Sequence, residues 1–234
     1  MPIGVRLRVW GEYACFTRPE MKVERVSYDV ITPSTARGIL EAVYWKPEIR
    51  WRITHLHVLK PIRFASLRRN EVASKIPANS VARVMRHGTG YLGLHVETDR
   101  QQRAATLLDD VDYVIEGRFD IVGGDPNPAK HLDQFSRRAR GGQCFHRPYL
   151  GCREFPADFA LVEPDEPIPR GYYSTQGEHD LGWMLDDIEY LADETGPVID
   201  SNGGRRWRAE PRFVAVRMVR GVIDLELCRP EART

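Results

Sequence analysis

The side chains best suited to chemistry concentrate in one segment of the chain, residues 128–140, with the sequence PAKHLDQFSRRAR. If this segment is a helix, Lys130 and Arg137 lie on one face, and His131 and Phe135 lie on the adjacent face. Lys130 and His131 then fall in the first turn, where unpaired backbone N–H groups and the helix dipole favour a bound phosphate. The spacing therefore puts an imidazole and a cation where an anion would bind.

Such a group of side chains could cleave a phosphodiester bond. An imidazole that titrates near neutral pH can transfer protons, a lysine ammonium can stabilise a non-bridging oxygen, and helix-end N–H groups add donors. The alternative is a basic helix that faces solvent, because runs of charge are usually solvated. Residues 128–140 alone leave both interpretations open.

Two other groups of residues could hold a metal ion. His55 and His57 would lie on one face of a strand, and Cys144, His146 and Cys152 are close together in the sequence. Neither group has the paired short spacings of a structural zinc site. We predict no metal and no cofactor, and interpret these residues as polar strand positions and ordinary buried cysteines.

The composition is that of a water-soluble globular protein, with 42% hydrophobic and 29% charged residues. No apolar run approaches the roughly 20 residues that a membrane span needs. The first residues, MPIGVR, alternate like a strand rather than like a secretory signal. With four cysteines and no signal, a disulfide framework is not expected, and the predicted compartment is the cytoplasm.

Charge is segregated along the chain, although the net charge is only +1. Residues 50–103 contain eleven basic and three acidic side chains, whereas residues 163–200 contain eleven acidic side chains and one arginine. A nearly neutral protein with this distribution can present a basic face to a polyanion. The alternative is again a set of solvated strand and helix faces.

The elements that must position these side chains follow from hydrophobic periodicity. Thr32 followed by Pro33 predicts the start of a first helix that Pro47 stops, and Asp125-Pro126 predicts the start of a second that ends at about Arg140. Alternating patterns predict strands over residues 5–10, 51–64, 111–122 and 150–162.

The predicted fold class is α+β, because the order of elements is β-α-β-β-α-β. This is the ferredoxin-like arrangement, which RNA-recognition motifs share. Between the second and third strands, residues 68–90 are basic and irregular, which is typical of an extended hairpin or loop.

Proline-rich residues 164–169 predict a linker between two domains. The ferredoxin-like domain would comprise residues 1–165, and a small antiparallel β-rich domain would comprise residues 166–234. The second domain is expected to contain an acidic helical stretch and a final hairpin, which are residues 181–191, 213–219 and 222–227.

Two stretches resemble a known family. Residues 28–47 (YDVITPSTARGILEAVYWKP) closely resemble the first-helix signature of the Cas-five family of CRISPR-associated proteins, in the RAMP superfamily. Residues 130–132 (KHL) and 143–155 (QCFHRPYLGCREF) look like its subtype I-C branch, also called Dvulg. The likeness covers essentially the whole chain.

The resemblance implies an RNA-recognition-like N-terminal domain and a metal-independent endoribonuclease. It implies cleavage of CRISPR precursor RNA at the base of each repeat hairpin, after which the protein stays on the 5′ tag with other subunits of the type I-C surveillance complex. The catalytic tyrosine, lysine and histidine of the family fall on Tyr44, Lys130 and His131. Attack by the RNA's own 2′-OH would leave 2′,3′-cyclic phosphate and 5′-hydroxyl ends.

RNA contacts are expected from the basic residues of the matched first helix, of the irregular segment and of the second helix. These residues are Arg37, Lys46, Arg68, Arg69, Arg137 and Arg138. Two other functions stay open beside the nuclease. One is a non-catalytic scaffold that only grips the RNA tag, and the other is a module that binds duplex DNA weakly through the basic segments.

Overall fold

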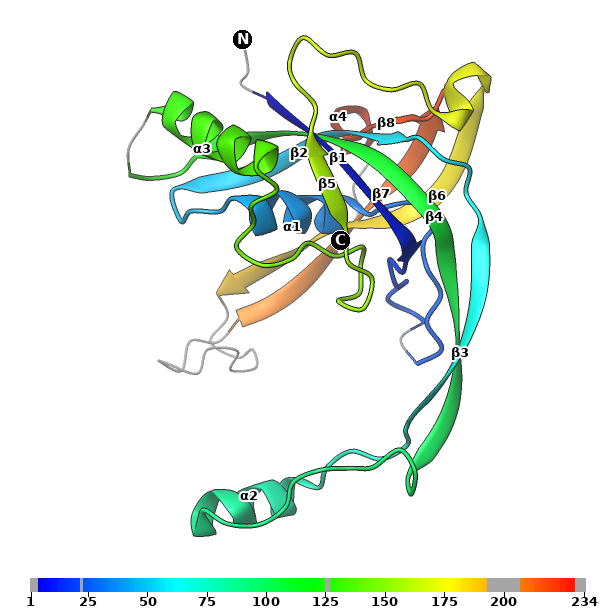
Figure 1. Ribbon diagram of the computed structural model, residues 1–234, viewed down its shortest axis with the longest axis vertical. Helices are drawn as coiled ribbons and strands as arrows, with labels where there is room; N and C mark the ends of the chain where they lie inside the picture. The colour runs from blue at the N-terminus through cyan, green and yellow to red at the C-terminus, as the bar shows by residue number, and fades with distance from the viewer. Residues whose placement is uncertain (1–3, 22, 125–126, 193–206, 230–234) are drawn as a thin grey trace.

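The computed structural model describes residues 4–21, 23–124, 127–192 and 207–229. Its strands form one eight-stranded antiparallel sheet, and the two longest helices lie against it (Figure 1). The elements, in chain order, are β1 (Gly4–Ala14), α1 (Pro33–Val43), β2 (Ile49–Val58), β3 (Phe64–Val72), α2 (Ala78–His87), β4 (Arg100–Ile121), α3 (Pro128–Arg140), β5 (Asp158–Leu161), a short 3-10 helix η1 (Tyr172–Thr175), β6 (Glu178–Ala192), β7 (Trp207–Val219), β8 (Val222–Asp224) and α4 (Leu225–Cys228).

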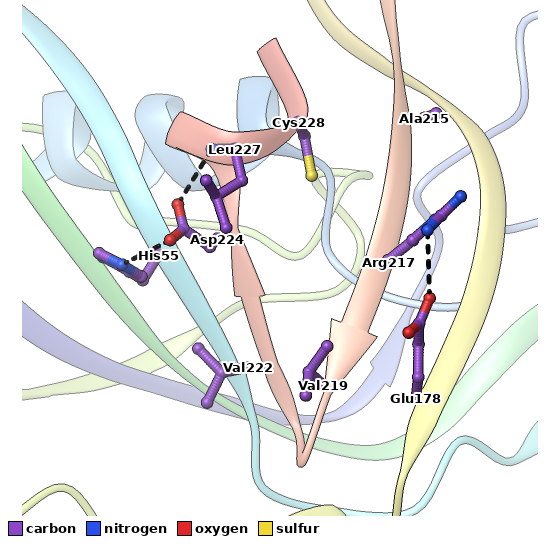
Figure 2. A pocket seen from close by; sticks show the side chains of 9 residues that line it. All are labelled: His55, Glu178, Ala215, Arg217, Val219, Val222, Asp224, Leu227 and Cys228. Atoms are coloured by element: carbon purple, nitrogen blue, oxygen red, sulfur yellow. Dashed lines mark hydrogen bonds and ion pairs between the residues drawn. The ribbon is translucent and has the colours of Figure 1, made fainter. Parts of the chain in front are cut away.

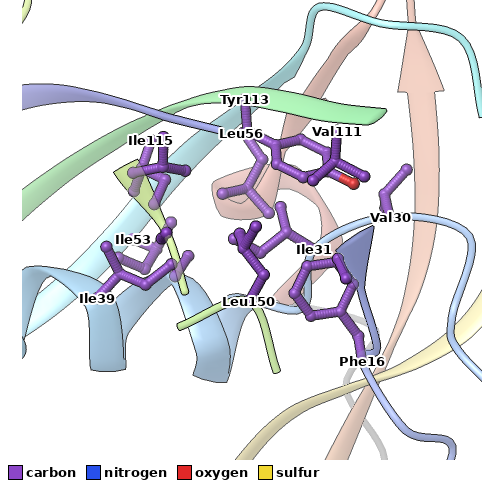
Figure 3. Close-up of a cluster of buried hydrophobic side chains, with 14 of the residues drawn as sticks. Phe16, Val30, Ile31, Ile39, Ile53, Leu56, Val111, Tyr113, Ile115 and Leu150 are labelled. Atoms are coloured by element: carbon purple, nitrogen blue, oxygen red, sulfur yellow. The ribbon is translucent and has the colours of Figure 1, made fainter. Parts of the chain in front are cut away.

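The strands follow the order β5-β1-β4-β2-β8-β7-β6 across the sheet, and β3 pairs with β4 beside this path. Helix α1 packs on β2 and β6, while α3 packs on β5 and β1. Apolar side chains from the sheet, from α1 and from the loops around them fill the space between the layers (Figure 3). Leu56, Ile115 and Leu150 are among those with no exposed surface.

A long hairpin, here called the arm, extends from the body of the molecule (Figure 1). It consists of β3, α2 and the part of β4 that pairs with β3, residues 100–108. The rest of β4 pairs with β1 and β2 inside the body. Where β4 changes partners, Asp110 has a backbone φ of 53°, in the left-handed region that aspartate tolerates better than most residues.

Several strand boundaries differ from those that periodicity predicts. The predicted strand 51–64 is two strands, because Pro61 cannot donate a ladder hydrogen bond and the chain turns there from β2 into β3. The predicted strand 111–122 begins earlier, at Arg100, since β3 supplies a partner for the polar first half of β4. The predicted strand 150–162 shortens to β5, which pairs with β1 through only four residues.

The prediction of an acidic helix at residues 181–191 is wrong, because these residues belong to β6, which pairs with β7. Register shifts between Asp180 and Gly182 and between Leu185 and Asp187 interrupt the alternation of this strand. The apolar residues therefore recur every three or four positions, which imitates a helix. The final hairpin is confirmed as β7 and β8, with Arg220 and Gly221 at the turn, but β8 ends at Asp224 and α4 follows.

The segment 68–90 belongs to a hairpin, as predicted. It is not irregular, however, because it contains the end of β3 and the helix α2. Strand β8 pairs with β2, so the strands beyond residue 166 extend the same sheet. The boundary between domains 1–165 and 166–234 stays a prediction. Among the described residues, no helix is long and apolar enough to cross a membrane.

Candidate active site

The C-terminal end of α1 is held by contacts that fix Tyr44. Tyr44 leaves the helix with extended backbone angles, and its N–H donates to Leu40 O at 2.9 Å. The indole N–H of Trp51 donates to Tyr44 O at 2.8 Å, and Arg138 Nη1 donates to Val43 O at 3.0 Å. A guanidinium at this helix end also complements the negative end of the dipole. The backbone around Tyr44 is therefore rigidly placed.

The first turn of α3 places His131 opposite Tyr44. Asn127 caps the helix, its side-chain oxygen accepting from Ala129 N at 3.0 Å, and Pro128 occupies the first helical position. The predicted start at Asp125-Pro126 lies outside the described residues. His131, Phe135 and Ala139 recur at four-residue intervals and form the buried face of α3.

The Tyr44 hydroxyl lies 2.9 Å from His131 Nδ1, within hydrogen-bond distance. Both residues are only 1% exposed. The ring of Phe119 meets the imidazole edge-on with centroids 5.8 Å apart, and the Arg138 guanidinium lies 5.3 Å from the centre of the Tyr44 ring. The two predicted catalytic residues from α1 and α3 are thus brought together in an aromatic surrounding.

Burial raises the pKa of the Tyr44 phenol above its ordinary value, and the positive charges of Arg138 and Lys130 offset this only in part. The phenol therefore keeps its proton at neutral pH and can donate it to His131 Nδ1. In that arrangement the neutral imidazole carries its own proton on Nε2.

His131 Nε2 faces Glu48, whose carboxylate oxygen Oε2 lies 3.9 Å away. Nε2 is buried and has no hydrogen-bond partner in the described part of the chain. The Glu48 side chain is 39% exposed, so it stands between the imidazole and solvent. The sequence gives no sign of this residue's position, since it follows Pro47 in an irregular connection.

The remaining predicted residues fall into two groups. Lys130 and Arg137 are exposed on α3, and Lys46 is exposed two residues beyond Tyr44, so these three lie on the elements that build the site. Arg37 instead forms an ion pair with Asp187 of β6 at 2.8 Å. The two arginines of β3 lie on the arm, which extends away from α1 and α3 (Figure 1).

The two arginines on the arm differ in their surroundings. Arg68 is exposed and forms no ion pair with another described residue. Arg69 is partly buried and pairs with Glu154, which also pairs with Arg25 at 3.3 Å.

The two histidines of β2 line a different face. His57 Nε2 lies 2.7 Å from Glu116 Oε1, and His55 Nε2 lies 3.6 Å from Asp224 Oδ2. His55 borders a cavity of about 620 Å³ between β2, β8, β7 and β6, drawn in Figure 2. Since Leu56 points into the core, this cavity lies across the sheet from Tyr44. No group of residues suited to a metal ion occurs in the described ranges.

Comparison with known proteins identifies the family. A family model for Cas5d, described as a CRISPR-associated protein, matches residues 4–226. The CRISPR pre-crRNA endoribonuclease Cas5d of Mannheimia succiniciproducens is 50% identical over 226 residues, covering 94% of both chains. The protein of the same name from Thermus thermophilus is 41% identical over 229 residues, covering 94% of this chain and 90% of that protein.

A solved crystal structure of a CRISPR-associated protein has the same fold. It superposes with a TM-score of 0.65 at 23% sequence identity, covering 100% of this chain and 97% of that one. The α+β architecture with its large antiparallel sheet is therefore shared with that protein. Together with the match of the family model over residues 4–226, these relatives show that the chain belongs to the Cas5d family of CRISPR-associated proteins.

Proposed function

We propose that this protein is an endoribonuclease that cleaves CRISPR precursor RNA at the base of the repeat hairpin. The observation that carries the proposal is the Tyr44–His131 pair, 2.9 Å apart, at the start of a basic helix whose first turn also holds Lys130. The names of the two relatives, which are pre-crRNA endoribonucleases, support the same activity.

Cleavage of the RNA by its own 2′-OH requires three contributions from the protein. It must accept the proton of the 2′-OH, stabilise the charge of the pentacoordinate phosphorane, and protonate the departing 5′-oxygen. His131 is suited to proton transfer, and Lys130 is suited to stabilising the non-bridging oxygens. Because the pKa of Tyr44 is raised, Tyr44 acts as a hydrogen-bond donor that orients the imidazole, and not as a base.

The sheet order supports a ferredoxin-like frame for this site. The segment β5-β1-β4-β2, with α1 joining β1 to β2 and α3 joining β4 to β5, corresponds to the split β-α-β arrangement. On this view β3 and α2 are an insertion. The protein would stay bound to the 5′ tag and join the other subunits of a type I-C surveillance complex in the cytoplasm.

The nuclease is tested with a hairpin repeat RNA in EDTA. We expect cleavage without a divalent ion, with 2′,3′-cyclic phosphate and 5′-hydroxyl ends, because the nucleophile is internal to the RNA. A 2′-deoxyribose at the cut site should abolish cleavage and leave binding near normal. Cleavage that persists with the deoxy substrate, or that requires a divalent ion, would refute this mechanism.

The burial of the imidazole favours a second candidate, a scaffold that grips the RNA tag without cutting it. His131 is 1% exposed, and Glu48 covers its Nε2. Tight binding of repeat RNA with no cleavage under any condition would support this function. Competition with duplex DNA at physiological salt separates both candidates from a DNA-binding module, since binding through phosphates weakens steeply as salt rises.

A further inference from the structure

A cavity of about 350 Å³ lies between α1 and the loop that follows α3, on a different face of α1 from Tyr44. Its volume is at the lower end of the roughly 300–1,000 Å³ found for small-molecule pockets. One wall is α1, and the other is residues 146–151. The side chains that matter below are Gly38, Glu41 and His146.

Gly38 opens this cavity. It sits in the interior of α1, where glycine costs about 1 kcal/mol relative to alanine. Its backbone is not in the left-handed region, and a Cβ added to it would have no heavy atom within 4 Å. Neither the local conformation nor packing against described residues requires a glycine here. The missing side chain leaves room for something outside the chain.

Glu41 supplies the polar group of the cavity. Its side chain is 32% exposed and lies 3.9 Å from the Arg37 guanidinium. Burial raises the pKa of the Glu41 carboxyl, and Arg37 only partly opposes this. A partly desolvated carboxylate accepts hydrogen bonds and repels phosphate, so a ligand of this cavity should present N–H donors.

Phe145 stands beside the cavity with 87% of its surface exposed. Its backbone N–H donates to Ala42 O at 2.8 Å, which anchors the loop to α1 and holds the ring in solvent. The ring meets His146 edge-on, with centroids 6.0 Å apart. The loop follows directly on the basic last turn of α3, which includes Arg137 and Arg138. An exposed aromatic ring is a surface on which a base of single-stranded nucleic acid can stack.

We propose that this cavity binds one unpaired guanine of the RNA through Glu41, while Phe145 stacks on a neighbouring base. Guanine is favoured because its Watson–Crick edge presents two adjacent donors, N1–H and the N2 amino group, to one carboxylate. Cytosine offers a single amino donor. Adenine, cytosine and uracil each place an acceptor beside their donor, against the carboxylate oxygens. The inference rests on the proposed function, because it takes RNA as the ligand.

The test compares the affinity of the purified protein for short single-stranded RNAs of sequence UUXUUU, where X is guanine, inosine, cytosine, adenine or uracil. We expect guanine to bind about tenfold to a hundredfold tighter than uracil, since hydrogen bonds to a charged group are worth about that much. Inosine, which lacks the N2 amino group, should lose part of this preference. Equal affinity for all five RNAs would overturn the proposal.

Variants locate the preference in the cavity. Gly38→Leu fills the space and should abolish the preference for guanine, whereas Gly38→Ala, its matched control, adds one methyl group and should retain it. Glu41→Gln should abolish the preference without blocking the cavity, so the test does not depend on the folding of Gly38→Leu. Phe145→Ala should weaken binding of all five RNAs alike. A guanine preference that survives in Glu41→Gln would contradict the assignment.

The outcomes also separate this inference from the proposed function. If the wild-type protein prefers guanine but never cleaves repeat RNA, the cavity assignment stands and the nuclease fails. If it cleaves repeat RNA and shows no base preference in the short RNAs, the nuclease stands and the cavity assignment fails. Unchanged RNA affinity of Phe145→Ala would assign the exposed ring to a protein partner instead.

Discussion

At the scale of single residues, variants of the Tyr44–His131 pair and of Lys130 distinguish a role in catalysis from a role in RNA binding. His131→Ala should slow single-turnover cleavage of a hairpin repeat RNA by about 10²–10⁴, the usual cost of losing a general acid or base. Binding of the same RNA should be nearly unchanged, because one imidazole contributes little to a polyanion interface. Lys130→Ala should lose rate and also some affinity, since its charge acts on both the ground state and the transition state.

Tyr44→Phe removes only the hydroxyl that lies 2.9 Å from His131 Nδ1. We expect a loss of rate together with a loss of about 1–3 kcal/mol in the free energy of unfolding, because a buried acceptor is left unpaired. The exposed Tyr190 gives a matched control in Tyr190→Phe, which should change neither quantity. If His131→Ala, Lys130→Ala and Tyr44→Phe all cleave at the wild-type rate, the active site lies elsewhere.

A second residue-scale prediction concerns the thiol of Cys152. A hydrogen bond from Cys15 and the nearby Arg25 guanidinium, whose Nη1 lies 3.7 Å from Cys152 Sγ, lower the pKa of Cys152 to about 6. The thiolate therefore predominates above that pH, and alkylation by iodoacetamide should rise as pH increases through about 6. The same hydrogen bond and burial raise the pKa of Cys15, so Cys15 should stay unmodified over this range.

Mass spectrometry of peptides after timed alkylation measures both cysteines in one sample. Arg25→Ala should shift the reactivity of Cys152 to higher pH, because it removes the positive charge beside the sulfur. A reactivity that rises only near pH 8 to 9 in the wild-type protein, the ordinary range for a thiol, would contradict the prediction.

Sequence reasoning reached part of the candidate site. Helical spacing put Lys130 and His131 in the first turn of α3, and only the family resemblance supplied Tyr44. The sequence does not show that His131 is buried, because a basic helix can bury one histidine while its cations face solvent. The sequence also gives no sign of Glu48, since the approach of this residue to His131 depends on how α1, β2 and α3 pack together.

At the scale of elements, the arm carries the most exposed part of the basic segment. Arg68→Glu should weaken binding of repeat RNA and reduce the slope of log K against log salt by about 0.7–0.9 for a lost phosphate contact. Arg69→Glu should reduce affinity by a different route, because it places a second negative charge next to Glu154 and loosens the loop after α3. Filter binding across a salt series distinguishes the two variants. An unchanged slope for Arg68→Glu would show that Arg68 is a solvated surface residue that contacts no phosphate of the RNA.

The sequence predicts an element correctly where the local residue pattern determines its structure. It fails where pairing with a distant strand determines that structure. Helix α1 follows from Thr32 and Pro33, which cap and start it. The apolar spacing of β6 predicts a helix, because the bulges that produce this spacing are defined only by the pairing with β7. The helix α2 is not among the predicted elements, although Ala78, Val81 and Met85 recur at helical spacing, because the basic and polar residues of the segment are typical of a loop; none of the residues of α2 is buried.

At the scale of the whole molecule, one buried carboxylate connects the β6 edge of the sheet to the central strand β2. Asp186 of β6 lies 3.3 Å from Arg212 of β7 and 3.3 Å from Arg229, which follows α4. Arg229 in turn donates to Ile53 O of β2 at 2.8 Å. The acidic strand is therefore joined to the N-terminal half of the sheet by this network.

Asp186→Asn should lower the free energy of unfolding by about 3 kcal/mol, the lower end of the cost of breaking a buried pair, since both arginines keep some contact with water. Urea denaturation measures this loss. Glu189→Gln on the exposed side of β6 is the matched control and should change stability little. Equal stability of the two variants would show that the network does not hold the sheet together.

The length of β4 has a mechanical consequence. Its 22 residues run without interruption from the arm into the body, and only at Asp110 do they exchange one set of neighbours for another. At about 3.3 Å per residue, the nine residues that pair with β3 span roughly 30 Å. The ladder of hydrogen bonds makes this stretch a stiff spacer. A subunit that binds α2 at the tip would be held at a fixed distance from the Tyr44–His131 pair, so the arm can define a spacing within an assembly.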